Sequence, residues 1–478
     1  MPAVLPGVLL TLALGFWGVR RGGHMWRDEA VTYDVAHRGL SDLWHTLGNA
    51  DAVHGLYYLL MYGLYGICEL FGRADPLLVM RIPSVLAMSV ATAGVAMLGR
   101  QLAGPRAGLL AGIVFAVIPS IQRFAQEGRS YAMVCALVVW ATYVLVRAAS
   151  ADGRRARRLW RWYGALMLVT CLLHEFAVFA LPAHALTVPW TARRPWARAA
   201  AVVVTGLAPL AVLSQRQKDQ VGWLHVDLSQ YAGATGLCVA GVVCAALLGR
   251  LGGRAADAGR PIGLRRPALA LLVTPTLALL LIAPVKPLYA DRYVLYAVAG
   301  LALLIGALLD QMSRGGRRRT AVAAVTAAAA VIALAPYSVH LRTPESRLDD
   351  TAAVTQAIQD AGSEGDAVLY MPSRRRVWSL PHPQAVAGLD DLALDRRPAA
   401  SHTLYGTEVG ADVIRARMLK RTRIVFVTDP SRDPVDRIPR EIVKRDVLKD
   451  SFEQCNTRSD RGWRVTLYAR PGHCPASP

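Results

Sequence analysis

The chain has 478 residues, of which 54% are hydrophobic and only 18% charged, and its mean hydropathy is +0.31. A soluble protein of this length carries nearer a quarter charged residues, so the composition favours a polytopic membrane protein and excludes disordered, collagen-like and disulfide-scaffold classes. The formal net charge of +20 would ordinarily suggest nucleic-acid binding. Most of that charge lies in short loops between apolar segments, so we expect no nucleic-acid partner.

About eleven apolar segments approach the ~20 residues that cross a bilayer, which predicts a mostly α transmembrane bundle over residues 1–338. The predicted spans are 4–20, 82–99, 107–121, 131–147, 162–176, 177–191, 199–214, 231–249, 268–284, 293–311 and 320–338. The first span follows no basic segment and precedes no small-residue cleavage site, so we interpret it as a retained helix and not as a signal peptide.

Alternate loops between these spans are strongly basic. The loops within 100–106, 147–161, 193–198, 250–266 and 314–319 hold 20 Arg against two acidic residues, Asp152 and Asp257. The positive-inside rule places such loops in the cytoplasm of a plasma-membrane protein. The N-terminus is then cytoplasmic and the C-terminal segment extracytoplasmic, although Arg20 and Arg21 run against this orientation.

Residues 339–478 differ from the rest and predict a small extracytoplasmic α/β domain. Helical patterns at 349–361 and 408–421 precede the short apolar runs 367–371 and 424–427, and 463–468 predicts a last strand. Cys455 and Cys474 both fall in this domain, where an oxidising compartment permits a disulfide. The other five cysteines lie in apolar surroundings and are expected to be small core residues: Cys68, Cys135, Cys171, Cys238 and Cys244.

The first extracytoplasmic loop, residues 21–81, carries the main candidates for chemistry. Asp28 and Glu29 follow the first span beside Trp26 and Tyr33, and aromatic side chains of this kind favour the membrane interface. A carboxylate there suits general-base work on an acceptor hydroxyl while a substrate's lipid tail stays in the bilayer. Adjacent side chains point in different directions, so we expect one of the two to face the substrate.

Cations recur in later outer loops. The second loop contains Arg123, Glu127 and Arg129, and its guanidinium groups could hold a phosphate that Glu127 helps to orient. A third cluster places Lys286, Arg292 and Tyr293 at an outer membrane face, and His174 lies at another outer end of a span. Interfacial snorkelling is the alternative explanation for these cations.

At these residues the chain resembles GT-C superfamily glycosyltransferases, especially family 39, which includes protein O-mannosyltransferases, and the related lipid-A aminoarabinose transferases. The features that carry the resemblance are Asp28-Glu29 after the first span, His54-x-x-Tyr57-Tyr58, Gln126-Glu127-x-Arg129-x-Tyr131, and Arg292-Tyr293 opening a late span. The resemblance covers residues 1–338. Many relatives have Pro-Pro after the histidine, whereas Gly55-Leu56 follows His54 here, so the role of His54 stays open.

The resemblance implies a polyprenyl-phosphate sugar donor and an acceptor hydroxyl on a cell-envelope glycan, lipid or protein, with transfer outside the bilayer. Asp28 would be the base, Glu29 would support it, and Glu127 is a rival base. The residues expected to bind the donor phosphate or substrate are Arg129, Arg292, Lys286, Tyr293, His54, Tyr57, Tyr131 and His174. No cluster has metal-ligand spacing, and a divalent cation bridging Asp28 or Glu29 to the donor phosphate stays an open alternative.

Two other functions are compatible with the sequence. A transporter or lipid flippase would show internal repeats and ionisable residues deep in its spans, whereas here these residues cluster at span ends. In the second alternative, the outer domain binds an anionic glycan through Ser373-Arg374-Arg375-Arg376 and Trp378, for which a solvated charge run is the simpler explanation.

Overall fold

The computed structural model describes residues 3–72, 75–217, 228–252, 262–286, 289–430 and 438–475. Arg254, Asp257 and Arg260 of the fourth basic loop lie outside these residues. The chain divides into two compact units. The first, called here the helical unit, contains residues 1–19, 51–57 and 78–342, and the second, the outer unit, contains residues 20–50, 58–77 and 343–478.

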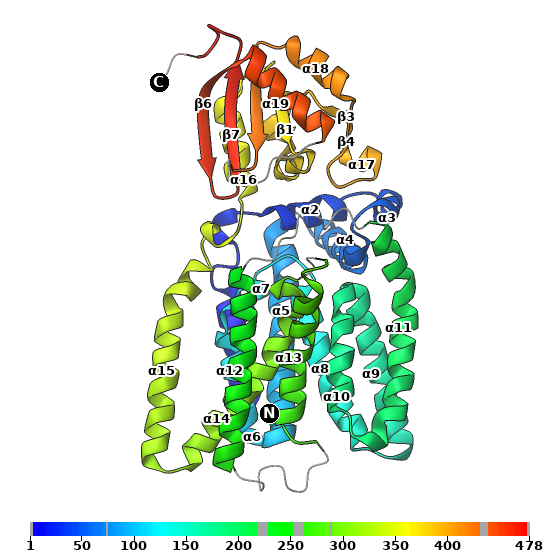
Figure 1. The fold of residues 1–478 in the computed structure, drawn as a ribbon, viewed down its shortest axis with the longest axis vertical. Helices are drawn as coiled ribbons and strands as arrows, with labels where there is room; N and C mark the ends of the chain where they lie inside the picture. The colour runs from blue at the N-terminus through cyan, green and yellow to red at the C-terminus, as the bar shows by residue number, and fades with distance from the viewer. Residues whose placement is uncertain are drawn as a thin grey trace. The chain divides into compact units, whose positions relative to one another are not determined.

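The helical unit is a bundle whose members are drawn in Figure 1. Its helices are α1 (Leu5–Phe16), α5 (Pro76–Ala103), α6 (Pro105–Val117), α7 (Pro119–Ala125), α8 (Tyr131–Ala149), α9 (Gly153–Leu173), α10 (Ala180–Thr187), α11 (Arg193–Arg216), α12 (Leu228–Gly252), α13 (Arg265–Ile282), α14 (Val298–Arg314) and α15 (Arg317–His340). Short 3-10 turns lie at Ala52–His54, Glu175–Phe179, Trp190–Ala192 and Asp291–Ala297.

The eleven predicted spans each correspond to helix in this unit, although not all are full-length. Seven described helices are long and apolar enough to cross a membrane, and the α6–α7 pair, bent by 66°, makes an eighth. The bend falls at Pro119, whose ring removes a backbone donor. The remaining three predicted spans are α1, which has 12 residues, α9, which begins in an Arg-rich turn, and the short apolar helix 175–187.

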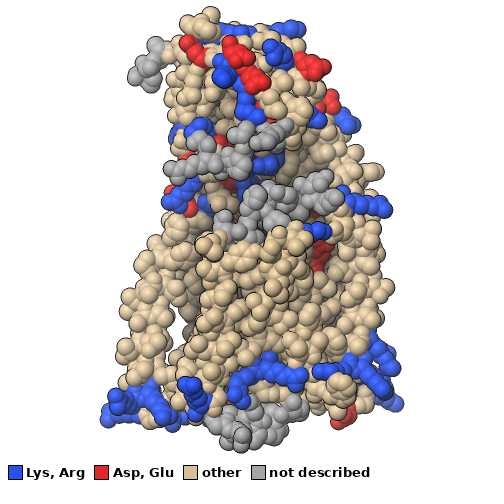
Figure 2. Space-filling view, in the orientation of Figure 1, with Lys and Arg blue, Asp and Glu red and all other residues tan. Residues whose placement is uncertain are grey.

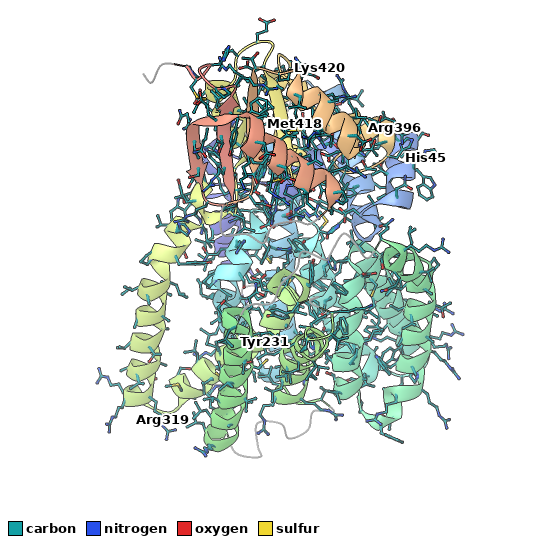
Figure 3. All side chains as sticks on the ribbon, turned by 45° about the horizontal axis from the view of Figure 1, so that its top comes forward. His45, Tyr231, Arg319, Arg396, Met418 and Lys420 are labelled. Carbon is teal, nitrogen blue, oxygen red and sulfur yellow. A yellow bond between two sulfur atoms is a disulfide. The ribbon has the colours of Figure 1, made fainter. Side chains whose placement is uncertain are left out.

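Burial within the helical unit separates a central helix from peripheral ones. The span ending in α14 is the most buried of the seven, and α15 is the least buried. Exposed apolar residues on α15, such as Val325 and Ile332, are suited to lipid. Figure 2 shows Lys and Arg side chains gathered at one end of the helices, beneath a surface of uncharged residues. Arg319 at the start of α15 points away from the bundle (Figure 3).

The outer unit combines three helices of the first loop with an α/β domain. The loop helices are α2 (Arg27–Ala36), α3 (Leu40–Asn49) and α4 (Gly55–Leu70), whose first turn belongs to the helical unit. The domain contains α16 (Thr351–Ala361), β1 (Ala367–Met371), β2 (Asp390–Asp391), β3 (Leu394–Arg396), α17 (Pro398–Ser401), β4 (Thr407–Glu408), α18 (Ala411–Leu419), β5 (Arg423–Thr428), α19 (Pro439–Ser451), β6 (Glu453–Asp460) and β7 (Trp463–Ala469).

The sheet has the strand order β2-β1-β5-β7-β6. β1 pairs in parallel with β2 and β5, while β7 pairs antiparallel with β5 and β6. Apolar residues of β1 and β5 pack on α18 and α19, and Met418 of α18, labelled in Figure 3, is fully buried in this core. The predicted α/β domain, with its helices near 349–361 and 408–421 and its strands at 367–371, 424–427 and 463–468, is confirmed.

The predicted disulfide also forms. Cys455 of β6 is bonded to Cys474 beyond β7, with 5.4 Å between the two Cα atoms. Three of the other cysteines are buried, Cys135, Cys171 and Cys238, while Cys68 and Cys244 are partly buried. The disulfide therefore fastens the C-terminal residues to an edge strand whose side chains are almost all exposed.

Candidate active site

The two adjacent carboxylates at the start of α2 have different environments. The Glu29 side chain is fully buried, and its Oε2 accepts a hydrogen bond from Nη2 of Arg21 at 2.9 Å. The Asp28 side chain, in contrast, is 21% exposed and lies 3.9 Å from Arg27 Nε. Glu29 is thus occupied by a buried ion pair, and Asp28 is the carboxylate of the pair that a substrate can reach.

A tight turn in the helical unit fixes Glu127 and Arg129 between α7 and α8. The Arg129 N–H donates to the Glu127 carbonyl at 2.8 Å, and the Ser84 hydroxyl of α5 donates to the same carbonyl at 2.7 Å. A Cβ at Gly128 would lie 2.4 Å from the sulfur of Met80, so a larger residue here would have to displace the buried Met80 side chain of α5. The side chain of Glu127 is buried, because the residue as a whole is only 1% exposed.

Arg129 is joined to a buried histidine and an aspartate. Nη2 of Arg129 lies 3.0 Å from Nε2 of His54, and Nδ1 of His54 lies 2.7 Å from Oδ1 of Asp51. A guanidinium only donates hydrogen bonds, so this contact leaves the His54 proton on Nδ1, from which it is donated to Asp51. The carboxylate, imidazole and guanidinium form a chain that fixes the direction of Arg129.

Aromatic rings and a second guanidinium lie around this chain. The His174 ring is 5.5 Å from that of His54 and 4.7 Å from that of Tyr293. Tyr131 lies 5.7 Å from His174, and Cζ of Arg292 lies 5.9 Å from the Tyr131 ring centre and 5.4 Å from that of Tyr293. We call His54, Arg129, Tyr131, His174, Arg292 and Tyr293, together with Asp51, the polar cluster.

The polar cluster gathers six predicted residues from four distant segments of the helical unit. Its guanidinium groups are planar donors that match the geometry of phosphate, and a poorly hydrated site strengthens such contacts. The aromatic rings leave an apolar surrounding in which a bound anion would be shielded from water. The cluster therefore has the donors that binding and neutralising a phosphate requires.

The other five predicted residues are not members of the polar cluster as defined above. Lys286 is exposed on the turn that follows α13. Of the two cations predicted in this loop, Lys286 and Arg292, we therefore assign only Arg292 to the polar cluster. Tyr57 is fully buried in the first turn of α4. Asp28 and Glu29 belong to the outer unit, and Glu127 to the helical unit.

Sequence reasoning missed Asp51 as a site residue. The residue adopts a left-handed conformation, with φ +54°, just before the turn that contains His54. Aspartate tolerates this conformation better than most residues, and the i to i+3 spacing of an acid and a histidine was the available signal. The pair shows that His54 has a defined partner although the Pro-Pro of many relatives is replaced here.

The arginine run of the outer unit is largely committed to internal ion pairs. Arg376 is buried and bonds the carboxylates of Asp391, at 2.6 Å, and Glu408, at 3.2 Å. Arg375 is buried against Asp429 and lies over the ring of Trp378. Two of the three guanidiniums thus stabilise the α/β domain, which argues against the glycan-binding alternative for this run.

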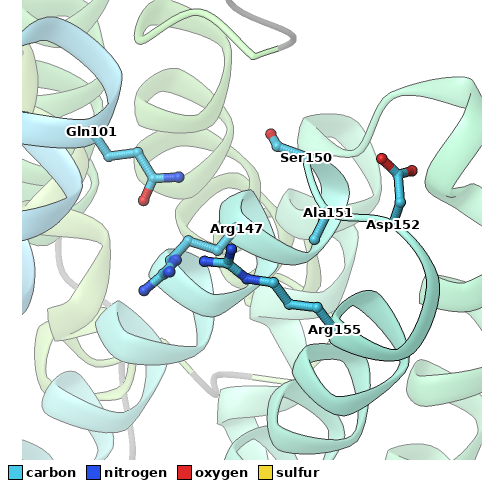
Figure 4. Close-up of a pocket in the computed structure, with 6 residues that line it drawn as sticks. All are labelled: Gln101, Arg147, Ser150, Ala151, Asp152 and Arg155. Carbon is cyan, nitrogen blue, oxygen red and sulfur yellow. The ribbon is translucent and has the colours of Figure 1, made fainter.

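A pocket of about 340 Å³ lies at the ends of α5 and α8 and the start of α9 (Figure 4). It is lined by Gln101, Arg147, Ser150, Ala151, Asp152 and Arg155. Figure 4 shows the guanidinium groups of Arg147 and Arg155 close together, with the Asp152 carboxylate directed away from them. Since these residues come from two of the basic loops and include no predicted catalytic residue, the pocket is not the candidate active site.

The described residues contain no group of three His, Cys, Asp or Glu side chains placed to hold a metal ion. Of the two carboxylates considered for a bridging cation, Glu29 is bonded to a guanidinium, whose positive charge opposes a second cation there. Asp28 is the remaining ligand at that position, and one carboxylate with waters and a donor phosphate is a pattern that Mg²⁺ accepts.

Comparison with known proteins agrees with the fold. Residues 58–215 match the model of the family described as dolichyl-phosphate-mannose-protein mannosyltransferase. ArnT from Cupriavidus metallidurans, in its apo state, superposes with a TM-score of 0.56 and 14% identity over 97% of both chains. The apo oligosaccharyltransferase of Archaeoglobus fulgidus superposes with a TM-score of 0.55 and 11% identity over 90% of this chain and 69% of its own.

No curated protein matches the chain by sequence. The matched segment includes the turn that carries Glu127 and Arg129, while the structural matches extend over both units. Together, the family match and the shared fold identify the chain as a multi-pass membrane glycosyltransferase with the GT-C fold.

Proposed function

We propose that the chain transfers a sugar, of the mannose type, from a polyprenyl-phosphate donor to a hydroxyl of an extracytoplasmic acceptor in the cell envelope. The acceptor is a glycan, a lipid or a protein. The observation that carries this proposal is the polar cluster, in which Arg129 and Arg292 present two guanidinium groups among aromatic rings. Such a site suits the phosphate of a lipid-linked sugar better than a neutral solute.

In the proposed reaction Asp28 takes the proton of the acceptor hydroxyl. The acceptor oxygen then bonds to the anomeric carbon of the sugar, and the bond from that carbon to the phosphate oxygen breaks. Polyprenyl phosphate leaves with an additional negative charge, which Arg129 and Arg292 neutralise. This stabilisation of developing charge is usually the largest contribution of an enzyme to such a step.

The choice of Asp28 as base is supported by its accessibility. Its side chain is 21% exposed, whereas Glu29 is fully buried in an ion pair and Glu127 is only 1% exposed. A base must come within hydrogen-bond reach of the acceptor hydroxyl. Glu29 is accordingly proposed to support the fold around Asp28, and Glu127 to hold the turn that presents Arg129.

The orientation of the chain is part of the proposal. We infer that the basic loops face the cytoplasm, that the N-terminus is cytoplasmic and that the outer unit is extracytoplasmic, as the distribution of arginine indicates. A cysteine introduced by Asp42→Cys should react with a membrane-impermeant maleimide on intact cells, and one introduced by Arg155→Cys only after permeabilisation. Labelling of both from the same side would reject this orientation.

The test of the reaction uses purified protein in liposomes with radiolabelled polyprenyl-phosphate mannose and an envelope extract. Asp28→Asn should lower transfer by about 10²- to 10⁴-fold, and Arg129→Ala by about 10²- to 10³-fold. The control Asp42→Asn changes an exposed carboxylate of the same loop and should leave transfer unchanged. Full activity of Asp28→Asn would exclude Asp28 as base, and Glu127→Gln would then test its rival.

If no mannose is transferred, a second donor sugar is tested. Polyprenyl-phosphate arabinose is the donor to test next, in the same liposomes and with the same variants. Flux of lipid or solute across the liposome membrane without sugar transfer to the extract would contradict the proposal and support a transporter.

A further inference from the structure

The start of α2, which carries Asp28, has no capping side chain of its own. The residue before the helix is Trp26, whose indole cannot accept a hydrogen bond, and no side chain of that residue caps the helix. The first N–H groups of a helix lack partners within the helix and require acceptors from elsewhere. In α2 such an acceptor comes from far along the chain.

Asp349, just before α16, supplies this acceptor. Its Oδ1 accepts the backbone N–H of Arg27 at 2.9 Å across 322 residues of sequence, and its Oδ2 accepts Nε1–H of Trp378 at 3.0 Å. The Asp349 side chain is fully buried, and Trp378 is fully buried as well. Both carboxylate oxygens are therefore engaged, one by the helix that bears Asp28 and one by the α/β domain.

Neighbouring contacts reinforce the attachment. The N–H of Thr351 donates to the carbonyl of Met25 at 2.9 Å, and the His24 imidazole lies against the Asp350 carboxylate. The carboxylate of Asp349 also lies at the positive end of the α2 dipole, where a negative charge is favourable. All of these residues belong to the outer unit, so the α/β domain and the first-loop helix are one structural body at this point.

We propose that Asp349 and Trp378 are positioning residues for the transfer reaction, because they fix the first turn of α2 and thereby the direction of the Asp28 carboxylate. This inference rests on the proposed role of Asp28 as base. It assigns to the C-terminal domain an indirect part in catalysis, through the position of Asp28 and without contact to substrate. The predicted signature is a fall in kcat with little change in the donor KM, since donor binding is proposed to depend on the polar cluster.

The experiment compares Asp349→Ala and Trp378→Phe with the wild-type chain in the liposome assay, varying polyprenyl-phosphate mannose at saturating envelope extract. Trp378→Phe keeps an aromatic ring but removes the N–H donor and part of the indole, and Trp463→Phe controls for the lost ring volume. A displaced catalytic group can cost up to about 100-fold in rate. We expect kcat to fall about 10- to 100-fold in Asp349→Ala and about threefold or more in Trp378→Phe, with donor KM within about twofold.

Matched controls are Asp450→Ala, which changes an exposed aspartate of α19, and Trp463→Phe, which makes the same change at another buried indole of the outer unit. Rates are divided by the folded fraction measured from tryptophan fluorescence and size-exclusion profile. Should Asp349→Ala fail to fold, Trp378→Phe decides alone.

The outcomes separate this inference from the proposed function. Loss of transfer in Asp28→Asn, together with control-like kcat in Asp349→Ala and Trp378→Phe, would overturn the positioning role and leave the proposed base in place. Full transfer by Asp28→Asn would remove the base and this inference with it. A rise in donor KM at unchanged kcat would also overturn the positioning role, because the variants would then act on donor binding.

Discussion

The buried ion pair between Arg21 and Glu29 predicts that substitutions of the adjacent residues Asp28 and Glu29 have different effects, one on transfer and the other on stability. The side chains of Arg21 and Glu29 are 1% and 0% exposed, and the two charged atoms lie 2.9 Å apart. Removing one member of a buried pair costs about 3–5 kcal/mol, because the other charge stays in a poorly hydrated site. Glu29→Gln keeps the shape and one acceptor, so we expect the lower end, about 3 kcal/mol.

For a unit of roughly 150–250 residues, 1 kcal/mol corresponds to about 2–4 °C in Tm. Glu29→Gln should therefore lower the Tm of the outer unit by about 6–12 °C, measured by tryptophan fluorescence in detergent, while transfer persists below that temperature. Asp28→Asn should change Tm by no more than about 4 °C, because it removes at most ~1 kcal/mol of charge–dipole attraction, and should lower transfer by about 10²- to 10⁴-fold.

A double-mutant cycle compares the single variants Arg21→Met and Glu29→Met with the double variant that carries both changes. Since replacing both partners by apolar side chains of similar size is often neutral, its Tm should lie closer to wild type than that of either single variant. An unchanged Tm in Glu29→Gln, or a double variant less stable than both singles, would show that the pair does not hold this loop.

Three further predictions concern other contacts. Asp51→Asn keeps the left-handed backbone but removes the charge that bonds His54. It should raise the donor KM about fivefold, for a loss of ~1 kcal/mol in donor binding. An unchanged KM would show that Asp51 does not contribute to donor binding. Gly128→Ala should lower transfer and Tm, because the new methyl group collides with α5, whereas Gly63→Ala, where the space is open, should do neither; equal behaviour of the two would refute the packing argument. Burial raises the pKa of the Asp349 carboxyl, so the folded state binds its proton more tightly than the unfolded chain does. Lowering the pH through the folded-state pKa should therefore raise the Tm of the wild type relative to that of Asp349→Asn. A Tm difference between the two proteins that is the same at pH 7 and at pH 4 would contradict this expectation.

The helical fold could be predicted because hydropathy acts over whole segments. Each of the eleven predicted spans proved to be helix, since about twenty apolar residues have few alternatives in a bilayer. Lengths were less predictable, as α1 and α10 show, because a helix packed among others need not cross the membrane completely. Strand β6 escaped prediction because its residues are polar and exposed on an edge of the sheet.

The site was predictable in its residue types and less so in its contacts. Six residues of the polar cluster were singled out from short motifs, in which arginines in outer loops run against the positive-inside bias. The pairing of Asp51 with His54 had only the i to i+3 spacing as a signal, and that of Glu29 with Arg21 had none, since both depend on a turn of the backbone. Lys286 looked equivalent to Arg292 in sequence, and only the fold shows that one of them joins the cluster.

The attachment of Arg27 to Asp349 has a consequence for biosynthesis. The acceptor that completes the first turn of α2 is translated 322 residues after the helix itself, which at about 5–20 residues per second is a delay of roughly 15–60 seconds. During that interval the nascent chain has inserted its bundle while the segment bearing Asp28 still lacks its final anchor. The first turn of α2 can therefore acquire this acceptor only after the ribosome has synthesised Asp349.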